Sequence, residues 1–164
     1  MKLYTSIFLA VLGAASIALV MQSCNQEPDF KTVRQEVLDQ HDQLMIDGEK
    51  VMTFQMRLDT LSKSGLKAIK LKQPALDTAA EQQQIKALQN ELVKADDSMN
   101  TWMHAFNPDA EGKSNHDAVL YFKAEKIKVN QIDSLYRKVL TNTSSYLKRF
   151  NMATDITVTH QHKM

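Results

Sequence analysis

Apolar residues recur in alternating steps of three and four along residues 85–106, and this spacing constrains the fold more than any other feature of the chain. The series is Ile85, Leu88, Leu92, Ala95, Met99, Trp102 and Phe106. On an α-helix with 3.6 residues per turn, such a series forms one continuous apolar stripe. An amphipathic helix gains most of its stability by packing that stripe against other helices. The spacing therefore predicts a helical bundle.

Two further segments show helical spacing. In the first, apolar residues recur every seven positions at Phe30, Val37, Leu44, Val51 and Leu58. The second contains Ala118, Phe122, Val129, Ile132, Tyr136, Val139, Tyr146 and Phe150, interrupted by polar Glu125 and Thr143. The chain has only four glycines and three prolines, which favours long helices with few turns.

Capping residues and prolines set the expected bounds of these helices. Asp29, Asp77 and Ser114 are good N-caps, and Pro74 and Pro108 end the first two segments. We expect one domain over residues 29–150, with helices at 29–72, 77–106 and 115–150, followed by a frayed tail over 151–164. Short loops make consecutive helices antiparallel. The predicted fold class is all-α, an up-down-up antiparallel three-helix bundle with coiled-coil-like packing.

The first helix has a second seam position that is not apolar. Arg34, His41, Gly48 and Gln55 recur there every seven residues, so the apolar stripe has a polar or small edge. We expect the helix to fray or kink at residues 62–65 (Ser-Lys-Ser-Gly) and then to continue to about residue 72.

The charges favour a third helix that lies in the groove between the other two. Residues 29–61 carry seven acidic and four basic side chains, and residues 77–106 carry five and two. Residues 115–150 carry three acidic and seven basic side chains. Each exposed ion pair contributes little, roughly 0.2–1 kcal/mol, so burial of the apolar stripes is expected to hold the bundle together.

The N-terminal segment resembles a bacterial lipoprotein signal peptide. Lys2 precedes an apolar run from Leu3 to Met21, and small Ser23 precedes Cys24, the one cysteine of the chain. The resemblance implies cleavage after residue 23, acylation of Cys24 and a tether over residues 24–28. The lipoprotein consensus prefers other residues where Met21 and Gln22 stand. A plain export signal, or an uncleaved helix long enough to cross a bilayer, is the alternative.

Both readings place the domain outside the cytoplasm of a Gram-negative bacterium, on the periplasmic or outer-membrane face of the cell envelope. A lone cysteine leaves no partner for a disulfide within the chain. Residues 24–164 carry 19 basic and 19 acidic side chains, so their net charge is zero. This balance does not favour binding to nucleic acid. The expected partner is the membrane, through the lipid anchor.

Histidines and methionines are expected to meet at one end of the bundle. If residues 72 and 77 flank a tight turn, the numbers of two residues that face each other on the first and second helices add up to roughly 149. If residues 106 and 115 flank the next turn, the corresponding sum for the second and third helices is 221. These registers bring the following residues together beside Trp102: His41, Met45, Met99, Met103, His104 and His116. Imidazole and thioether groups together suit a soft ion such as copper. The leading expectation is that the methionines fill the core and that no cofactor binds, with copper as the alternative.

Motifs of the common catalytic sites are missing from the sequence. It contains no Glu-x-x-His pair for a di-iron bundle, no haem attachment motif, no phosphate-binding glycine loop and no Gly-x-Ser-x-Gly elbow. A thin bundle also seldom offers the concave pocket that a catalytic site requires. We therefore expect a non-enzymatic structural or protein-binding module of the cell envelope, with a soft-metal-binding lipoprotein as the alternative.

Three sequence motifs resemble a family of small, uncharacterised bacterial lipoproteins, some of which carry the automatic label "viral A-type inclusion protein". The motifs are His41-Asp42-x-x-Met45, Met99-x-x-Trp102-Met103-His104-x-Phe106 and Tyr121…Ile132-x-x-Leu135. The resemblance covers most of residues 30–150. It implies a coiled-coil composition and no established activity, so no catalytic residue carries over.

The same two registers predict an overhang at the start of the first helix. They place residue 115 beside residue 43, so residues 29–42 would project beyond the second hairpin by roughly 20 Å. Phe30, Val33, Val37 and Leu38 lie on that projection. An exposed apolar stripe of this kind is typically covered. We therefore expect this segment to form a membrane-proximal stalk whose stripe at residues 30–38 packs on the loop at residues 107–114, on a second copy of the chain or on a partner protein.

Overall fold

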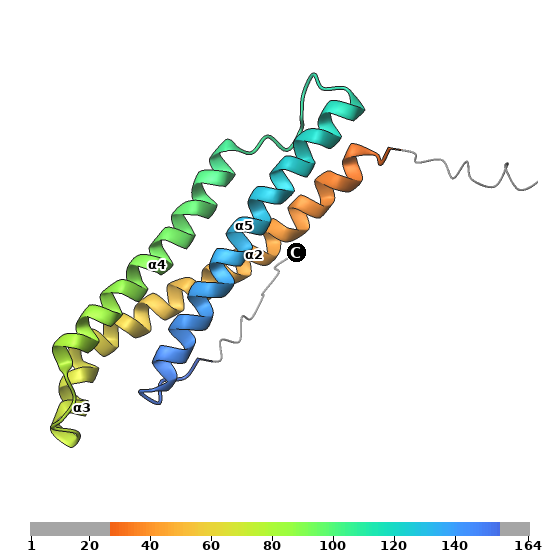
Figure 1. Cartoon of the computed structure of the whole chain (residues 1–164). Helices are drawn as coiled ribbons and strands as arrows, with labels where there is room; N and C mark the ends of the chain where they lie inside the picture. Colours follow the sequence, from red (N-terminus) through yellow and green to blue (C-terminus); the bar gives the residue numbers. More distant parts are fainter. Residues whose placement is uncertain (1–26, 155–164) are drawn as a thin grey trace, which may run out of the picture.

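The structure, a computed structural model, describes residues 27–154 (Figure 1). Helix α2 (Phe30–Thr60) continues through a π-helical segment (Leu61–Gly65) into α3 (Leu66–Lys72), and is followed by α4 (Thr78–Ala105) and α5 (Asn115–Lys148). No strand occurs within the described range. The prediction of an all-helical chain with three long helical segments is confirmed. Cys24, the signal segment at residues 1–23 and most of the tail at 151–164 lie outside the described residues.

Side-chain caps begin the three long helices at the expected residues. The Asp29 carboxylate accepts a hydrogen bond from the backbone N–H of Lys31. The carboxylate of Asp77 and the hydroxyl of Ser114 accept equivalent backbone hydrogen bonds at the starts of α4 and α5. Each cap satisfies one or two of the backbone N–H groups that have no partner in the first turn of a helix.

The segment expected to fray or kink is a continuous helix with one wider turn. Leu61 and Leu66 are both buried, although they are five residues apart. In a regular α-helix, a step of five residues would turn their side chains about 140° away from each other. The π-helical turn takes up the additional residue, and both leucines stay on the face that packs on the core.

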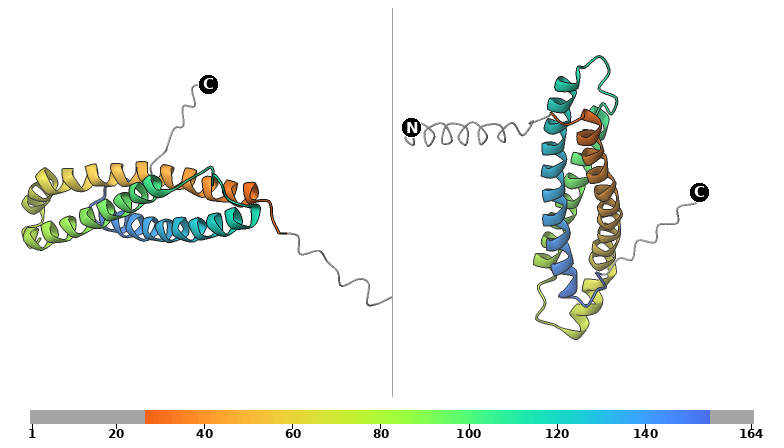
Figure 2. Two further views of the ribbon diagram at one scale, coloured as in Figure 1. Left: turned by 90° about the horizontal axis from the view of Figure 1, so that it is seen from above. Right: turned by 90° about the vertical axis from the view of Figure 1, so that its right-hand side faces the viewer.

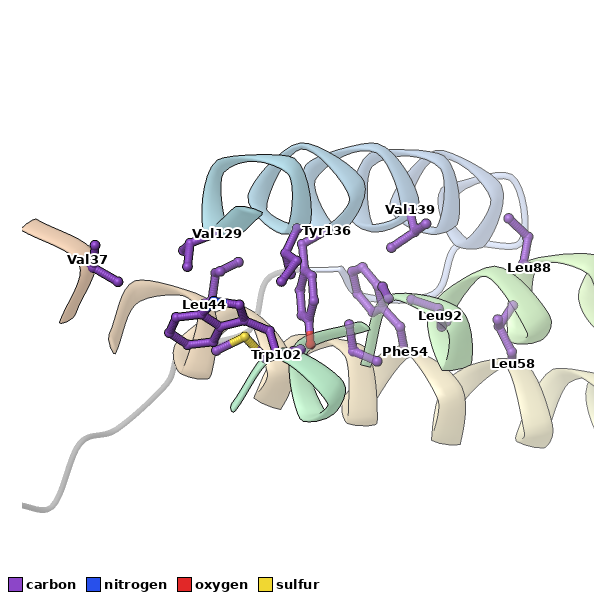
Figure 3. Packing of buried hydrophobic residues seen from close by; sticks show 14 of the residues in the cluster. Val37, Leu44, Phe54, Leu58, Leu88, Leu92, Trp102, Val129, Tyr136 and Val139 are labelled. Carbon is purple, nitrogen blue, oxygen red and sulfur yellow. The ribbon is translucent and has the colours of Figure 1, made fainter. Parts of the chain in front are cut away.

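The basic helix α5 packs against both acidic helices, whereas α2 and α4 contact each other less (Figures 1 and 2). Lys126 of α5 pairs with Glu36 of α2, and Arg149 just after α5 pairs with Glu81 of α4, each at 2.8 Å. Figure 3 shows the apolar residues between the helices, among them Leu44, Phe54 and Val139, packed in one row along the long axis.

The expected overhang at residues 29–42 is wrong. The Asn115 side-chain oxygen accepts a hydrogen bond from the Phe30 N–H at 3.1 Å, so α5 begins beside the first turn of α2. Val33 and Val37 are buried, and the Phe30 ring stacks on Phe122 with a centroid distance of 6.2 Å. The stripe at residues 30–38 is therefore part of the core.

The reason is the path of residues 106–114. They do not form a tight turn but run beyond the end of α4 to reach the top of α5 (Figure 1). The backbone there adopts positive φ at Ala110 and Gly112, and the Ala110 side chain is buried. The sequence pattern predicted the length of α5 correctly, but the predicted position of its first turn along α2 is wrong.

The register between α2 and α4 also differs from the expected one. The hydroxyl of Ser62 donates to the Gln82 side chain at 2.6 Å, and the Gln82 amide donates to the Ser62 carbonyl at 2.7 Å. The numbers of facing residues on α2 and α4 therefore add up to 144 and not to the expected 149. By this register α3 projects past the start of α4 by more than one turn, and residues 73–77 run back along it.

Candidate functional site

A polar layer separates α2 from α4 along much of their shared length. On α2, the layer contains His41, Gln55 and Ser62, with Gly48 between them; on α4, it contains Gln82, Gln89 and Asp96, with the Met103 thioether at the end. Ser62 and Gln82 form one end, and His41 lies against Met103 near the other end. In both pairs the two residue numbers add up to 144. The same register therefore places Gln55 opposite Gln89 and Gly48 opposite Asp96. At about every second turn, the contact between α2 and α4 therefore contains polar side chains where a coiled-coil seam would have apolar ones.

His41 contacts a residue on each side of its imidazole ring. Nδ1 lies 3.0 Å from the Asp42 carboxylate, and Nε2 lies 3.4 Å from the Met103 sulfur. The ring centroid is 5.9 Å from that of Trp102, with a tilt of 39°. About a quarter of the His41 side chain is exposed, so solvent reaches the site from one side.

A buried carboxylate holds Trp102 in place. The indole N–H donates to Glu125 of α5 at 2.8 Å, and Glu125 is only 4% exposed. Lys128 pairs with the same carboxylate at 2.7 Å, and this hydrogen bond raises the pKa of the Lys128 ammonium group. Glu125 interrupts the apolar stripe of the third helix in the sequence, and its role is to satisfy the indole N–H in the core.

Aromatic rings extend from Trp102 toward the start of α2. The Trp102 ring stacks on Phe106 with a centroid distance of 4.7 Å, and Phe106 contacts Tyr121 and Phe122. The Tyr121 hydroxyl also accepts a hydrogen bond from the Asn107 N–H, which fixes the start of the connecting loop. This aromatic cluster forms a rigid wall behind His41.

A hollow of about 300 Å³ opens beside the histidine. The residues that line it come from α2, from the end of α4 and from the loop that follows: Leu38, His41, Trp102, Met103, Phe106 and Pro108. Its walls are mostly apolar, and the imidazole and the thioether are the two groups in it that can donate a lone pair.

The structure brings together only some of the residues expected to form a metal cluster. His41 and Met103 are in contact, whereas Met99 is buried in the core and Met45 is about half exposed. His104 is exposed on the next position of α4.

His116 lies too far along the bundle to join them. Its ring bonds to Glu27 at 2.7 Å, level with the start of α2. Residue 104 is level with residue 40 and His116 is level with about residue 30, so His104 and His116 are separated by about 15 Å along the axis. The expected cluster at that level is wrong for His116, because α5 begins higher than a tight turn would place it. Within residues 27–154, no group of three or more His, Cys, Asp or Glu side chains is arranged to hold a metal ion.

Tyr136 links α5 to the polar layer. It reaches across the core from α5 (Figure 3), and its hydroxyl lies 3.5 Å from the Asp96 carboxylate. Burial, with the nearby negative charge of Asp96, raises the pKa of this hydroxyl. It therefore stays protonated and can act as a donor at every physiological pH.

Two features of this face were not predicted. Asp42 holds the far side of the His41 ring, but an acidic residue beside a histidine in a helix carries no distinctive signal. Three methionines on the outer side of α2 are exposed, which their positions next to the apolar stripe could have indicated: Met45, Met52 and Met56.

None of the helices described between residues 27 and 154 is long and apolar enough to span a membrane. Comparisons of the chain with protein-family models, with curated proteins and with solved structures found no match. The resemblance to the small lipoprotein family therefore stays an expectation from the sequence motifs, and the site must be interpreted from its own geometry.

Proposed function

We propose that this protein is a lipid-anchored, non-enzymatic helical module of the Gram-negative cell envelope. In this proposal it is an up-down-up three-helix bundle that binds another envelope protein through the outer face of α2 and α4. The observation that carries the proposal is a row of exposed methionines beside the polar layer. This α2–α4 face replaces the stripe at residues 30–38, which is occupied by α5.

The exposed methionines lie on one side of α2. Met45, Met52 and Met56 are 47%, 64% and 58% exposed. Met45 and Met52 follow Leu38 at steps of seven residues, and Leu38 lines the hollow against α4. The row therefore runs along the α4 side of α2. Val93 of α4, which is also exposed, lies three turns along from Gln82 on the side that contacts α2.

Methionine rows of this kind favour a helical partner. The methionine side chain is flexible and polarisable, and it is common on surfaces that adapt to apolar helices. A helix seated along α2 and α4 would complete a four-helix bundle. The fit does not require α2 and α4 to separate, because the polar layer already keeps their contact slight.

The net negative charge of α2 and α4 favours a basic partner. Both α2 and α4 carry more acidic than basic residues, and α5, the basic amphipathic helix, occupies their inner side. A second basic amphipathic helix is the partner that best suits their outer side. The chain's own anchor, through Cys24, would keep the module at the membrane where such partners reside.

Photocrosslinking in cells tests the proposed surface. A photoreactive amino acid at position 52 or 56 should give one discrete crosslinked species, absent when the same group stands at position 120 or 127. Leu120 and Ile127 are matched controls, because they are exposed apolar residues at helical spacing on α5. Equal crosslinking from both helices, or none from α2, would contradict the proposal. A product of twice the chain's own mass would identify a second copy as the partner and would contradict a separate envelope protein.

Labelling with palmitate tests the anchor separately. The wild-type chain should incorporate the label, and Cys24→Ala should not, because the thiol of Cys24 is the one acylation site. A wild-type chain that takes up no label would overturn the lipid anchor without bearing on the α2–α4 face.

A further inference from the structure

We propose that His41 and Met103 form a binding site for a monovalent soft metal ion, Cu(I), beside Trp102. Met45, one turn along α2 from His41 and about half exposed, is the further thioether that could reach the ion. This site goes beyond the proposed protein-binding function and shares only Met45 with the exposed methionine row.

The hydrogen bonding of His41 leaves a lone pair directed at sulfur. A carboxylate can only accept, so the contact with Asp42 makes Nδ1 the protonated nitrogen. In the neutral ring, Nε2 then carries a lone pair, and it faces the lone pairs of the Met103 sulfur at 3.4 Å. Two electron-pair donors in such contact are stabilised by an electrophile between them. A histidine whose second nitrogen donates to a carboxylate is also the usual arrangement of a metal ligand.

The distance between the two donor atoms fits a shared metal ion. Zinc sites in proteins have metal–nitrogen bonds of about 2.0–2.1 Å and metal–thiolate bonds of about 2.3 Å, and these lengths serve as a guide here. At a tetrahedral angle, these bond lengths place nitrogen and sulfur about 3.5 Å apart, close to the observed 3.4 Å. The site can therefore bind a metal with little movement of either helix.

The donor types and the surroundings select the ion. Thioether sulfur is a poor ligand for hard cations and a good one for Cu(I). The neighbouring Trp102 ring presents an electron-rich surface to a cation, and its indole N–H is bonded to the buried Glu125 carboxylate. Apolar Leu38 and Phe106 complete the walls. A singly charged ion suits this apolar hollow better than a divalent one, because its desolvation costs less.

The competing interpretation is a structural contact. If His41 is protonated, its Nε2–H donates a weak hydrogen bond to the sulfur, and Met103 simply packs against the aromatic rings. The two interpretations differ in what the chain does when Cu(I) is offered, and the single tryptophan of the chain reports on the site directly.

Titration of the full-length chain in detergent with Cu(I) is the test. Any Cys24 thiol that carries no lipid is alkylated beforehand, and a chromogenic Cu(I) chelator competes under anaerobic, reducing conditions. We expect one equivalent of Cu(I) to be withdrawn from the chelator and the Trp102 fluorescence to be quenched in step. Zn(II) at the same concentration should leave the fluorescence unchanged.

Variants assign the ligands. His41→Ala and Met103→Leu should each weaken Cu(I) binding at least tenfold while the helical circular dichroism is retained, and Met45→Leu should weaken it less. Met52→Leu is the matched control and should bind as the wild type does, because it removes a more exposed thioether from the same helix. Wild-type protein that fails to compete with the chelator, or His41→Ala and Met103→Leu variants that bind as tightly as the wild type, would overturn the proposal.

Discussion

Helix α2 has two neighbours and meets them in different ways. Toward α5 it presents a continuous apolar stripe, with residues such as Val37, Leu44 and Val51 fully buried. Toward α4 it presents polar or small residues at every seventh position, from His41 to Ser62. The comparison indicates that the core forms mainly against α5, and that stability depends less on the contact between α2 and α4.

The largest effect is expected from the α5 interface. Phe122→Ala should lower the free energy of unfolding by about 3–5 kcal/mol, because the ring is completely buried and contacts Phe30, Phe106 and Tyr121. Urea denaturation measures the change. Ile127→Ala, on the same helix but 60% exposed, is the control and should change stability by less than about 0.5 kcal/mol. Similar losses in both variants would mean that α5 is not the dominant core helix.

An intermediate effect is expected where α5 supports the candidate site. Glu125→Ala leaves the Trp102 indole N–H buried without an acceptor and should lower stability by about 1–3 kcal/mol. The fluorescence of the single tryptophan should shift to the red as the ring becomes hydrated. Glu125→Gln keeps an acceptor and should restore most of both properties. An unchanged emission spectrum in Glu125→Ala would show that the carboxylate does not hold the ring.

A smaller effect of opposite sign is expected in the polar layer. Gly48→Ala should stabilise the chain by about 0.5–1 kcal/mol, because nothing lies within 4 Å of the added methyl group and alanine favours the helix. Gly65→Ala is the matched substitution on the same rod, and its methyl group would approach Leu61 to 2.9 Å. It should therefore gain nothing. Thermal denaturation compares the two, and a destabilised Gly48→Ala would show that α2 and α4 pack more closely there than described.

The smallest effect is expected from the ion pair between α2 and α5. A double-mutant cycle with Glu36→Gln and Lys126→Gln should give a coupling of roughly 0.2–1 kcal/mol that fades as salt is added, because both side chains are partly exposed. A coupling that exceeds the Phe122→Ala effect would reverse our ranking of charge and apolar burial in this interface.

The helices could be predicted because their signals are local. The capping side chains of Asp29, Asp77 and Ser114 and the stripe from Ile85 to Trp102 each act within a few residues, and the structure has them as expected. The offsets of the helices along the bundle axis could not be predicted, because they depend on the path of the connecting loops. The composition of residues 106–114 does not distinguish a loop that extends past the end of α4, with Ala110 buried, from one that turns tightly.

The candidate site divides in the same way. The polar positions of α2 were visible as a break in the heptad pattern, and His41 was among them. Met103 was expected in the same cluster, and the structure places its sulfur against the His41 ring. His116 was expected there too, and that expectation is wrong, because the level of α5 depends on the path of residues 106–114.

The π-helical turn at residues 61–65 determines where the chain can tolerate the loss of one residue. A helix that carries one residue more than its core requires can lose that residue without changing which side chains face inward. Deletion of one residue between Ser62 and Ser64 would leave Leu61 and Leu66 four apart, on the same face of an ordinary α-helix. The same deletion elsewhere in α2 would rotate everything beyond it by about 100°. The turn therefore marks the place where this chain can lose one residue and keep the same core.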